Sequence, residues 1–345
     1  MTTSYIGADV HCKFTEVAVE RHGEIVMRDR VRTDISSLRD FLQIVPKPRV
    51  VVIEEGTMSG WLSRNLRADV EEFVVCDPWR NKMIWSDGDK TDPLDAAGLA
   101  ALQRGGYTRA VYHTDDEERL ALKEIVALYH DRMHEAVRQI NKLRAQGRAY
   151  GVRIPARVLK HRSARATWMA TVEPAALMQR LSILWRGWDT VQSQVKLAKA
   201  QMVRQAGDYP VIAAWQDLPG VGVVRAATLF AYLDTPWRFG SVKKLWKYCG
   251  LGLKHRASGT DKNGRPRKGR LSLYRRANSR LKDALLGAAV TAIYRGRGNP
   301  FSEYYARCVK KGMTESNARH AVARKLLTVM WGMWKTNSRY DARQV

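Results

Sequence analysis

The sequence predicts an α/β domain at the N-terminus, then a helical coiled-coil middle and a mostly α-helical C-terminal domain. Strand and helix patterns alternate over the first 110 or so residues. Beyond them, apolar residues recur at every third or fourth position, which is typical of helices. A chain of 345 residues is long enough for two domains and a connecting element, since domains usually have roughly 100 to 200 residues. We expect their boundaries at 1–112, 113–208 and 209–345.

The N-terminal elements follow a recognisable order. A short apolar strand at Ser4–Asp9 precedes two alternating strands that meet at a His22-Gly23 turn. A helix at Ile35–Val45 and a buried strand at Val50–Ile53 come next. The remaining elements are a helix at Gly60–Ala68, a strand at Phe73–Cys76 and a helix at Pro93–Gln103. A hairpin followed by alternating helices and strands is the order of an RNase H-like α/β fold.

The helical middle has the spacing of an antiparallel hairpin or coiled coil. Its apolar positions three or four residues apart are Leu120, Ile125, Leu128, Met133 and Val137. Such a segment spaces the two ends of the protein, and we expect it to mediate self-association as a homo-oligomer. From Tyr209 onward the pattern is almost wholly helical.

The charge balance points to a polyanionic partner. Lys and Arg number 59 against 34 Asp and Glu, a net charge of +25, which favours nucleic acid through counterion release. We expect no membrane partner, because the sequence contains no run of about 18 apolar residues and no charged segment followed by an apolar core at its start. The expected location is the bacterial cytoplasm, associated with the nucleoid.

Acidic residues stand where strands and helices of the first domain begin or end. Asp9 ends the first strand, Glu54 and Glu55 end the fourth, and Asp92 and Asp95 open a helix. Two residues three apart share a helix face, so four acids could converge at one sheet edge. Such convergence suits two Mg²⁺ or Mn²⁺ ions that act on a phosphodiester. Taken singly, acids at such positions are more often helix caps or exposed strand-end charges than metal ligands.

Two motifs of the C-terminal domain favour contact with phosphate. The segment Leu218–Ala227 places Gly220 and Gly222 in a Pro-Gly-x-Gly turn before a helix, as in a helix-hairpin-helix element. Of the 29 residues of Lys254–Lys282, 11 are Lys or Arg and only Asp261 is acidic. We expect a mobile basic loop there that lies against a phosphate backbone. The candidate contacts within it are Arg256, Arg265, Arg267, Lys268 and Arg270.

Several runs together resemble one protein family. IGADVHCK, VVIEEGTMSGWL, CDPWRNK and DKTDPLDAAGLA are similar to the RuvC-like DEDD domain of bacterial insertion-sequence transposases, the bridge-RNA-guided recombinases. The resemblance implies that Asp9, Glu55, Asp92 and Asp95 are the metal ligands. Glu55 is favoured over Glu54 because Thr57 has the family spacing; since Met58 replaces the usual glycine, both glutamates remain candidates.

The C-terminal runs LPGVGVVRAATLFAYLD and WRFGSVKKLWKYCGLGLKHRASG resemble the second domain of the same family. In that pattern the serine of the Ser-Gly pair is the nucleophile, which corresponds to Ser258; Leu253 stands where a proline is usual. The resemblance implies a phosphoserine–DNA intermediate, formed with help from the metal-bound carboxylates. It also implies donor and target DNA, a structured noncoding guide RNA, and assembly as a dimer or tetramer.

Three other functions fit parts of the sequence. A RuvC-type junction nuclease would use the metal site with water and no serine. An actin-like ATPase also starts with a strand, an aspartate and a hairpin, but a second glycine-rich phosphate loop is missing from the sequence. An architectural nucleic-acid-binding protein would use the acids only as caps and the basic loop only as a coat for DNA.

Overall fold

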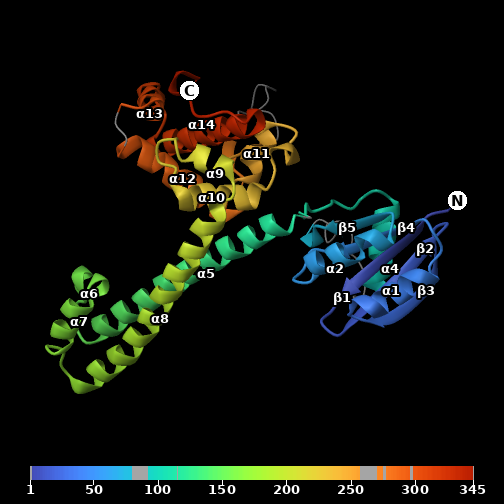
Figure 1. Cartoon of the computed structure of the whole chain (residues 1–345), viewed down its shortest axis with the longest axis horizontal. Helices are drawn as coiled ribbons and strands as arrows, with labels where there is room; N and C mark the ends of the chain where they lie inside the picture. The colour runs from blue at the N-terminus through green and yellow to red at the C-terminus, as the bar shows by residue number, and fades with distance from the viewer. Residues whose placement is uncertain are drawn as a thin grey trace, which may run out of the picture. The chain divides into compact units, whose positions relative to one another are not determined.

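The structure, a computed structural model, describes residues 2–79, 92–114, 116–256, 270–274, 277–295 and 298–344. The chain divides into two compact units, Met1–Asp115 and Asp116–Val345. The first is an α/β unit and the second is mostly helical, as the sequence predicted (Figure 1). Each unit is described by itself below.

A five-stranded mixed sheet forms the first unit. Its order is β3-β2-β1-β4-β5; β1, β2 and β3 are antiparallel, whereas β1, β4 and β5 are parallel. The turn between β2 and β3 lies at His22 and Gly23, whose φ angles of 58° and 91° suit a tight hairpin. The strands are β1 (Ser4–Val10), β2 (Phe14–Arg21), β3 (Glu24–Arg32), β4 (Arg49–Glu54) and β5 (Glu72–Cys76).

Helices cover both faces of this sheet. One face packs against α1 (Ile35–Ile44) and α2 (Ser59–Leu66), which is followed by the 3₁₀ turn η1 (Arg67–Asp69). The other face packs against α4 (Asp92–Arg104), whose Leu99 joins Val52 and Val74 in a separate small core. The helices and strands predicted for this unit are therefore confirmed, with ends within about two residues.

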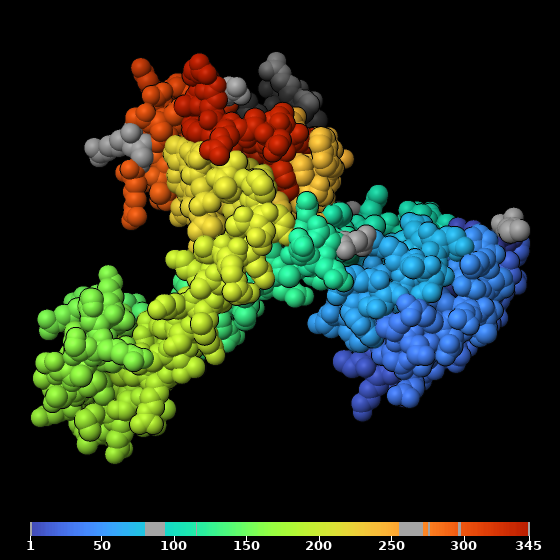
Figure 2. Space-filling view, viewed as in Figure 1, coloured from blue at the N-terminus to red at the C-terminus, as the bar shows by residue number. Residues whose placement is uncertain are grey.

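The second unit begins with two long antiparallel helices that lie side by side (Figure 1). They are α5 (Glu117–Ala149) and α8 (Ala175–Ala206). The short helices α6 (Ala156–Lys160) and α7 (Arg162–Met169) connect them, and their side chains cover the far end of the hairpin (Figure 2). The predicted helical hairpin is confirmed.

The C-terminal core is a helical bundle that also takes in the first turns of α5. Leu122 and Val126 of α5 are fully buried in the same core as Trp215 and Phe230. The bundle helices are α9 (Pro210–Trp215), α10 (Val223–Leu233), α11 (Val242–Tyr248), α12 (Ser279–Tyr294), α13 (Pro300–Lys310) and α14 (Glu315–Thr336), with 3₁₀ turns η2 (Pro236–Arg238) and η3 (Ala342–Gln344). Among the described residues, no helix is long and apolar enough to span a membrane.

A two-stranded antiparallel ribbon interrupts this helical bundle. Strand β6 (Leu253–Arg256) pairs with β7 (Arg270–Leu273), so that Leu253 lies opposite Leu273 and Arg256 opposite Arg270. The C-terminal domain is mostly helical, as expected, and the ribbon is an addition that the helical pattern did not predict. The ribbon was not predicted because its two strands pair across a long polar stretch of the sequence.

Candidate active site

The carboxyl ends of β1 and β4 bring two acids to one face of the sheet. Gly7 of β1 faces α4, and side chains two residues apart along a strand point to the same face, so Asp9 lies on the α4 side. Because Gly7 pairs with Val52 in the parallel ladder, Glu54 lies on this side too. Glu54 in turn pairs with Cys76, which is buried in the core beneath α4. Asp9 and Glu54 therefore share the face that α4 covers.

Helix α4 approaches this face very closely. A Cβ placed on Gly7 would lie 1.9 Å from the carbonyl oxygen of Ala96 and 2.6 Å from the amide nitrogen of Ala100. Only a glycine allows the two backbones to meet in this way. The contact fixes the N-terminal half of α4, which begins at Asp92 and carries the half-buried Asp95 one turn later.

The sheet register distinguishes the two adjacent glutamates. Glu54 is the last residue of β4, and Glu55 follows it, with its N–H donating to the Cys76 carbonyl over 2.9 Å. Continued alternation would point Glu55 to the opposite face, which α1 and α2 cover. The structure thus favours Glu54 as the partner of Asp9, whereas the spacing to Thr57 favoured Glu55.

Asp9 already has a polar neighbour. The Nε2 atom of His11 lies 3.1 Å from Oδ2 of Asp9, whose side chain is 27% exposed. Across the hairpin, Asp9 pairs with Glu16, which forms an ion pair with Arg30.

Within the described residues, no three His, Cys, Asp or Glu side chains are close enough to hold a metal ion; the Asp92 side chain is not among those described. The carboxylate donors nevertheless suit a hard divalent cation.

The predicted nucleophile and most of its basic neighbours lie outside the described residues. Ser258, Arg265, Arg267 and Lys268 fall within 257–269, and for Arg256 and Arg270 only the backbone is described. Their pairing in the ribbon places the residues that flank 257–269 opposite each other. Ser258 follows the described end of β6 by two residues.

The base of the ribbon is fixed to the helical core. The Tyr274 N–H donates to the Gly252 carbonyl over 2.9 Å, and the Lys247 ammonium lies 4.5 Å from the centroid of the Tyr274 ring. On the other side, Arg324 of α14 donates to the Leu251 carbonyl over 3.2 Å. These contacts hold the base of the β6–β7 ribbon rigidly against the helical bundle.

The two glycines of the predicted helix-hairpin-helix turn have different surroundings. Gly220 has a φ of +83°, and a Cβ there would lie 2.3 Å from the Ala288 carbonyl of α12. Gly220 therefore serves close helix packing, and its own carbonyl accepts a 2.6 Å hydrogen bond from Arg225. Gly222, at the N-cap of α10, has no atom within 4 Å of its Cβ position. Of the two, only Gly222 has open space for a phosphate.

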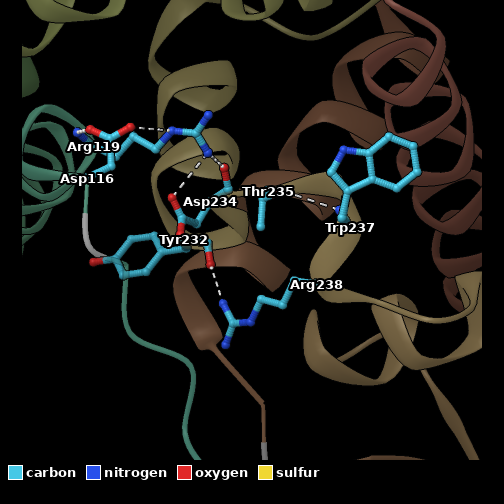
Figure 3. Close-up of polar contacts among 7 residues, drawn as sticks. All are labelled: Asp116, Arg119, Tyr232, Asp234, Thr235, Trp237 and Arg238. Atoms are coloured by element: carbon cyan, nitrogen blue, oxygen red, sulfur yellow. Dashed lines mark hydrogen bonds and ion pairs between the residues drawn. The ribbon is translucent and has the colours of Figure 1, made fainter. Parts of the chain in front are cut away.

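An ion pair that the sequence did not indicate ties α5 to α10 (Figure 3). Arg119 lies between two acids: its Nε is 3.1 Å from Asp116, and its Nη1 is 3.4 Å from Oδ1 of Asp234 and donates to the Asp234 carbonyl. Asp234 is buried and has a φ of +65°, which is uncommon for a residue with a side chain. The contact joins residues that lie 115 positions apart, so spacing along the sequence could not reveal it.

Comparison with known proteins identifies the family. A profile for transposases of the IS110 DEDD type matches residues 6–149, and a profile described as "Transposase IS116/IS110/IS902 family" matches residues 213–306. The two matches cover the sheet unit with α5 and most of the C-terminal bundle. The chain belongs to the IS110 family of transposases.

Individual relatives of this transposase agree with the assignment. The chain is 24% identical to "Putative transposase y4qE" of Sinorhizobium fredii over 96% of its own length and 88% of the relative. It is 28% identical to an IS110 protein of Streptomyces coelicolor, covering 44% of this chain but only 36% of that protein. It is 29% identical to a "Pilin gene-inverting protein" of Moraxella lacunata, covering 36% of this chain and 37% of the relative. Two of these three matches thus span little more than a third of the relatives' length.

Proposed function

We propose that this transposase cuts and rejoins DNA strands, using a carboxylate metal site in its sheet unit and Ser258 as the nucleophile. The observation that carries the proposal is the placement of Asp9 and Glu54 on one sheet face, beneath the helix that carries Asp92 and Asp95. The strand order, with β1, β4 and β5 parallel, supports an RNase H/RuvC-like domain.

Asp9, Glu54, Asp92 and Asp95 would hold Mg²⁺ or Mn²⁺, with Glu55 as the alternative to Glu54. A divalent ion bound there supplies charge stabilisation to a reacting phosphodiester. The chain itself orients the acids: Gly7 sets the distance of α4 from β1. His11, beside Asp9, is placed to fix the orientation of that carboxylate.

In the chemical step, the Ser258 hydroxyl loses its proton and its oxygen bonds to phosphorus. The P–O3′ bond breaks, and the leaving oxygen takes up a proton to become a free 3′-OH. The phosphoserine link retains the bond energy of the phosphodiester, so a 3′-OH from another strand can displace the serine without ATP. Arg256, Arg265, Arg267, Lys268 and Arg270 are candidates to neutralise the charge that develops on phosphorus.

The proposal further includes a structured guide RNA, donor and target DNA, and assembly through the α5–α8 hairpin. The net charge of +25 supports polyanion binding, and delegating sequence choice to an RNA leaves the protein to bind backbone and shape. Sequencing the nucleic acid that copurifies with the protein tests this part. A discrete RNA is expected, and purification of an active protein free of RNA would contradict it.

Two substitutions test the chemistry. Ser258→Ala should abolish both strand cleavage and the covalent protein–DNA adduct, and unchanged nicking by this variant would favour a RuvC-type nuclease that uses water. Glu54→Gln should lose at least about 100-fold in cleavage, as expected when a metal ligand is removed, whereas the neighbouring Glu55→Gln is the matched control. A larger loss of cleavage in Glu55→Gln than in Glu54→Gln would instead identify Glu55 as the ligand.

A further inference from the structure

The α5–α8 hairpin, from Ala136 to Ala206, carries an unusual share of the positive charge. Between residues 136 and 206 there are 14 Lys and Arg but only two acids, Glu173 and Asp189. This fifth of the chain therefore has a net charge of +12, out of +25 for the whole protein. Neither the carboxylate site nor the serine segment accounts for this concentration.

A cavity opens where α5 ends. Its volume is about 970 Å³, and three arginines line it, Arg144 and Arg148 from the last turns of α5 and Arg153 from the segment that follows. Arg144 and Arg148 are four residues apart and so share one helix face. All three side chains are exposed. We call this cavity the arginine pocket.

The backbone around the arginine pocket is firmly held. After α5 the chain folds back, and the Val152 N–H donates to the Gly147 carbonyl over 2.9 Å. A Cβ on Gly147 would lie 2.6 Å from the Val152 carbonyl. Ile154 and Val158 then anchor the segment in the core of the hairpin end. The backbone of the pocket is therefore preformed, which lowers the entropic cost of binding a ligand.

One of the two acids of this stretch is already paired with other arginines. Asp189 is engaged by Arg165 at 2.8 Å and by Arg162 at 3.5 Å. In the part of the chain that the structure describes, Arg144, Arg148 and Arg153 form no ion pair. Three guanidinium groups that repel one another around a single cavity are stabilised when an anion binds between them.

We propose that the arginine pocket binds the phosphate backbone of duplex DNA, through residues other than those of the carboxylate site and the serine segment. Cations continue beyond the pocket at the exposed Arg157 and Lys160 of α6, which suits a polymer better than a single small anion. DNA is the polyanion on which a transposase acts. The inference rests on the proposed function only for the identity of this ligand.

The test measures binding of the full-length protein to a duplex DNA of about 30 base pairs at several salt concentrations, without divalent metal, so that no cleavage intervenes. The triple variant Arg144→Gln, Arg148→Gln, Arg153→Gln should bind on the order of 10- to 100-fold more weakly at physiological salt. The magnitude of the slope of log K against log salt should fall by about 2 to 3, since each phosphate contact contributes about 0.9.

Three controls make the result decisive. The triple variant Arg28→Gln, Lys310→Gln, Lys311→Gln removes the same charge from exposed positions elsewhere and should bind nearly as the parent does. Replacing the three pocket arginines by lysine should retain most of the salt slope and excludes misfolding as the cause. Asp9→Asn should bind DNA normally even if it does not cut, so failure of the proposed chemistry remains distinguishable from failure of the pocket.

Parent-like affinity and salt slope for the pocket variant would overturn the inference. An equal loss in the charge-matched control would do the same, because the effect would then reflect net charge alone. A parallel titration with an RNA hairpin of equal length tests the ligand: weakening with RNA but not with DNA would refute the assignment to DNA.

Discussion

Replacing Gly7 by alanine should displace α4 from the sheet. The new Cβ would lie 1.9 Å from the Ala96 carbonyl oxygen, whereas ordinary contacts of a Cβ begin near 3.4 Å, so the helix must move by about 1.5 Å. Both nearest atoms belong to the helix backbone and cannot rotate away as a side chain would. Overpacking of this kind costs about 1–3 kcal/mol.

Hydrogen exchange in the full-length protein measures this effect locally. A cost of about 2 kcal/mol should speed exchange of the α4 and β4 amides roughly 30-fold. Because Asp92 and Asp95 move with α4, DNA cleavage should fall by about 100-fold for a shift of 1 Å or more. DNA binding measured without metal should not change.

Gly60→Ala is the matched control for this prediction. A Cβ on Gly60 of α2 would meet only side-chain atoms, at 3.4 Å and 3.8 Å, and alanine favours a helix by up to about 1 kcal/mol. This variant should keep parent-like exchange and cleavage. If Gly7→Ala also exchanged and cleaved as the parent does, the close approach of α4 and β1 would not position the acids, and the reasoning would fail.

Two further predictions concern the helical unit. Arg119→Gln should lower the free energy of unfolding by about 1–3 kcal/mol in urea denaturation, because it leaves the buried Asp234 carboxylate unpaired. The control Arg339→Gln, which loses only an exposed ion pair with Asp217, should lower it by less than about 0.5 kcal/mol. Equal losses in the two variants would contradict the role of burial. Burial lowers the pKa of His130, which hydrogen-bonds with Thr228. The unfolded chain therefore takes up a proton near pH 6.5 that the folded protein binds only at lower pH. The contribution of His130 to the free energy of unfolding should be fully present above that pH and decline as the pH falls below it. In urea titrations at several pH values, His130→Gln should show a smaller decline than the parent. An unchanged pH profile in this variant would refute the prediction.

Local patterns predicted most of the fold. The hairpin turn at His22 and Gly23, the buried VVVI strand and the two long amphipathic helices each follow from contiguous residues. Hydrophobic periodicity and turn chemistry act over a few residues, so a single sequence carries them. The same holds for the acids at strand and helix ends, whose positions along the elements were predicted correctly.

The features that the sequence did not reveal depend on pairing between distant segments. Whether Glu54 or Glu55 joins Asp9 depends on the register of β4 against β1, since a shift of one residue exchanges the two faces. The β6–β7 ribbon depends on the pairing of two separate segments, in which Arg256 lies opposite Arg270. Likewise, the packing role of Gly220 depends on α12, which follows it by more than fifty residues.

The most direct test of the carboxylate site is the DNA-cleaving activity of Asp9→Asn at increasing Mg²⁺ concentration. Asparagine keeps the size of the side chain but removes the charge that a divalent ion requires. If Asp9 holds a catalytic divalent ion, this variant binds DNA as the parent does but cuts no strand and forms no covalent adduct. Mg²⁺-dependent cleavage at the parental rate would contradict the carboxylate site on which the proposed function depends.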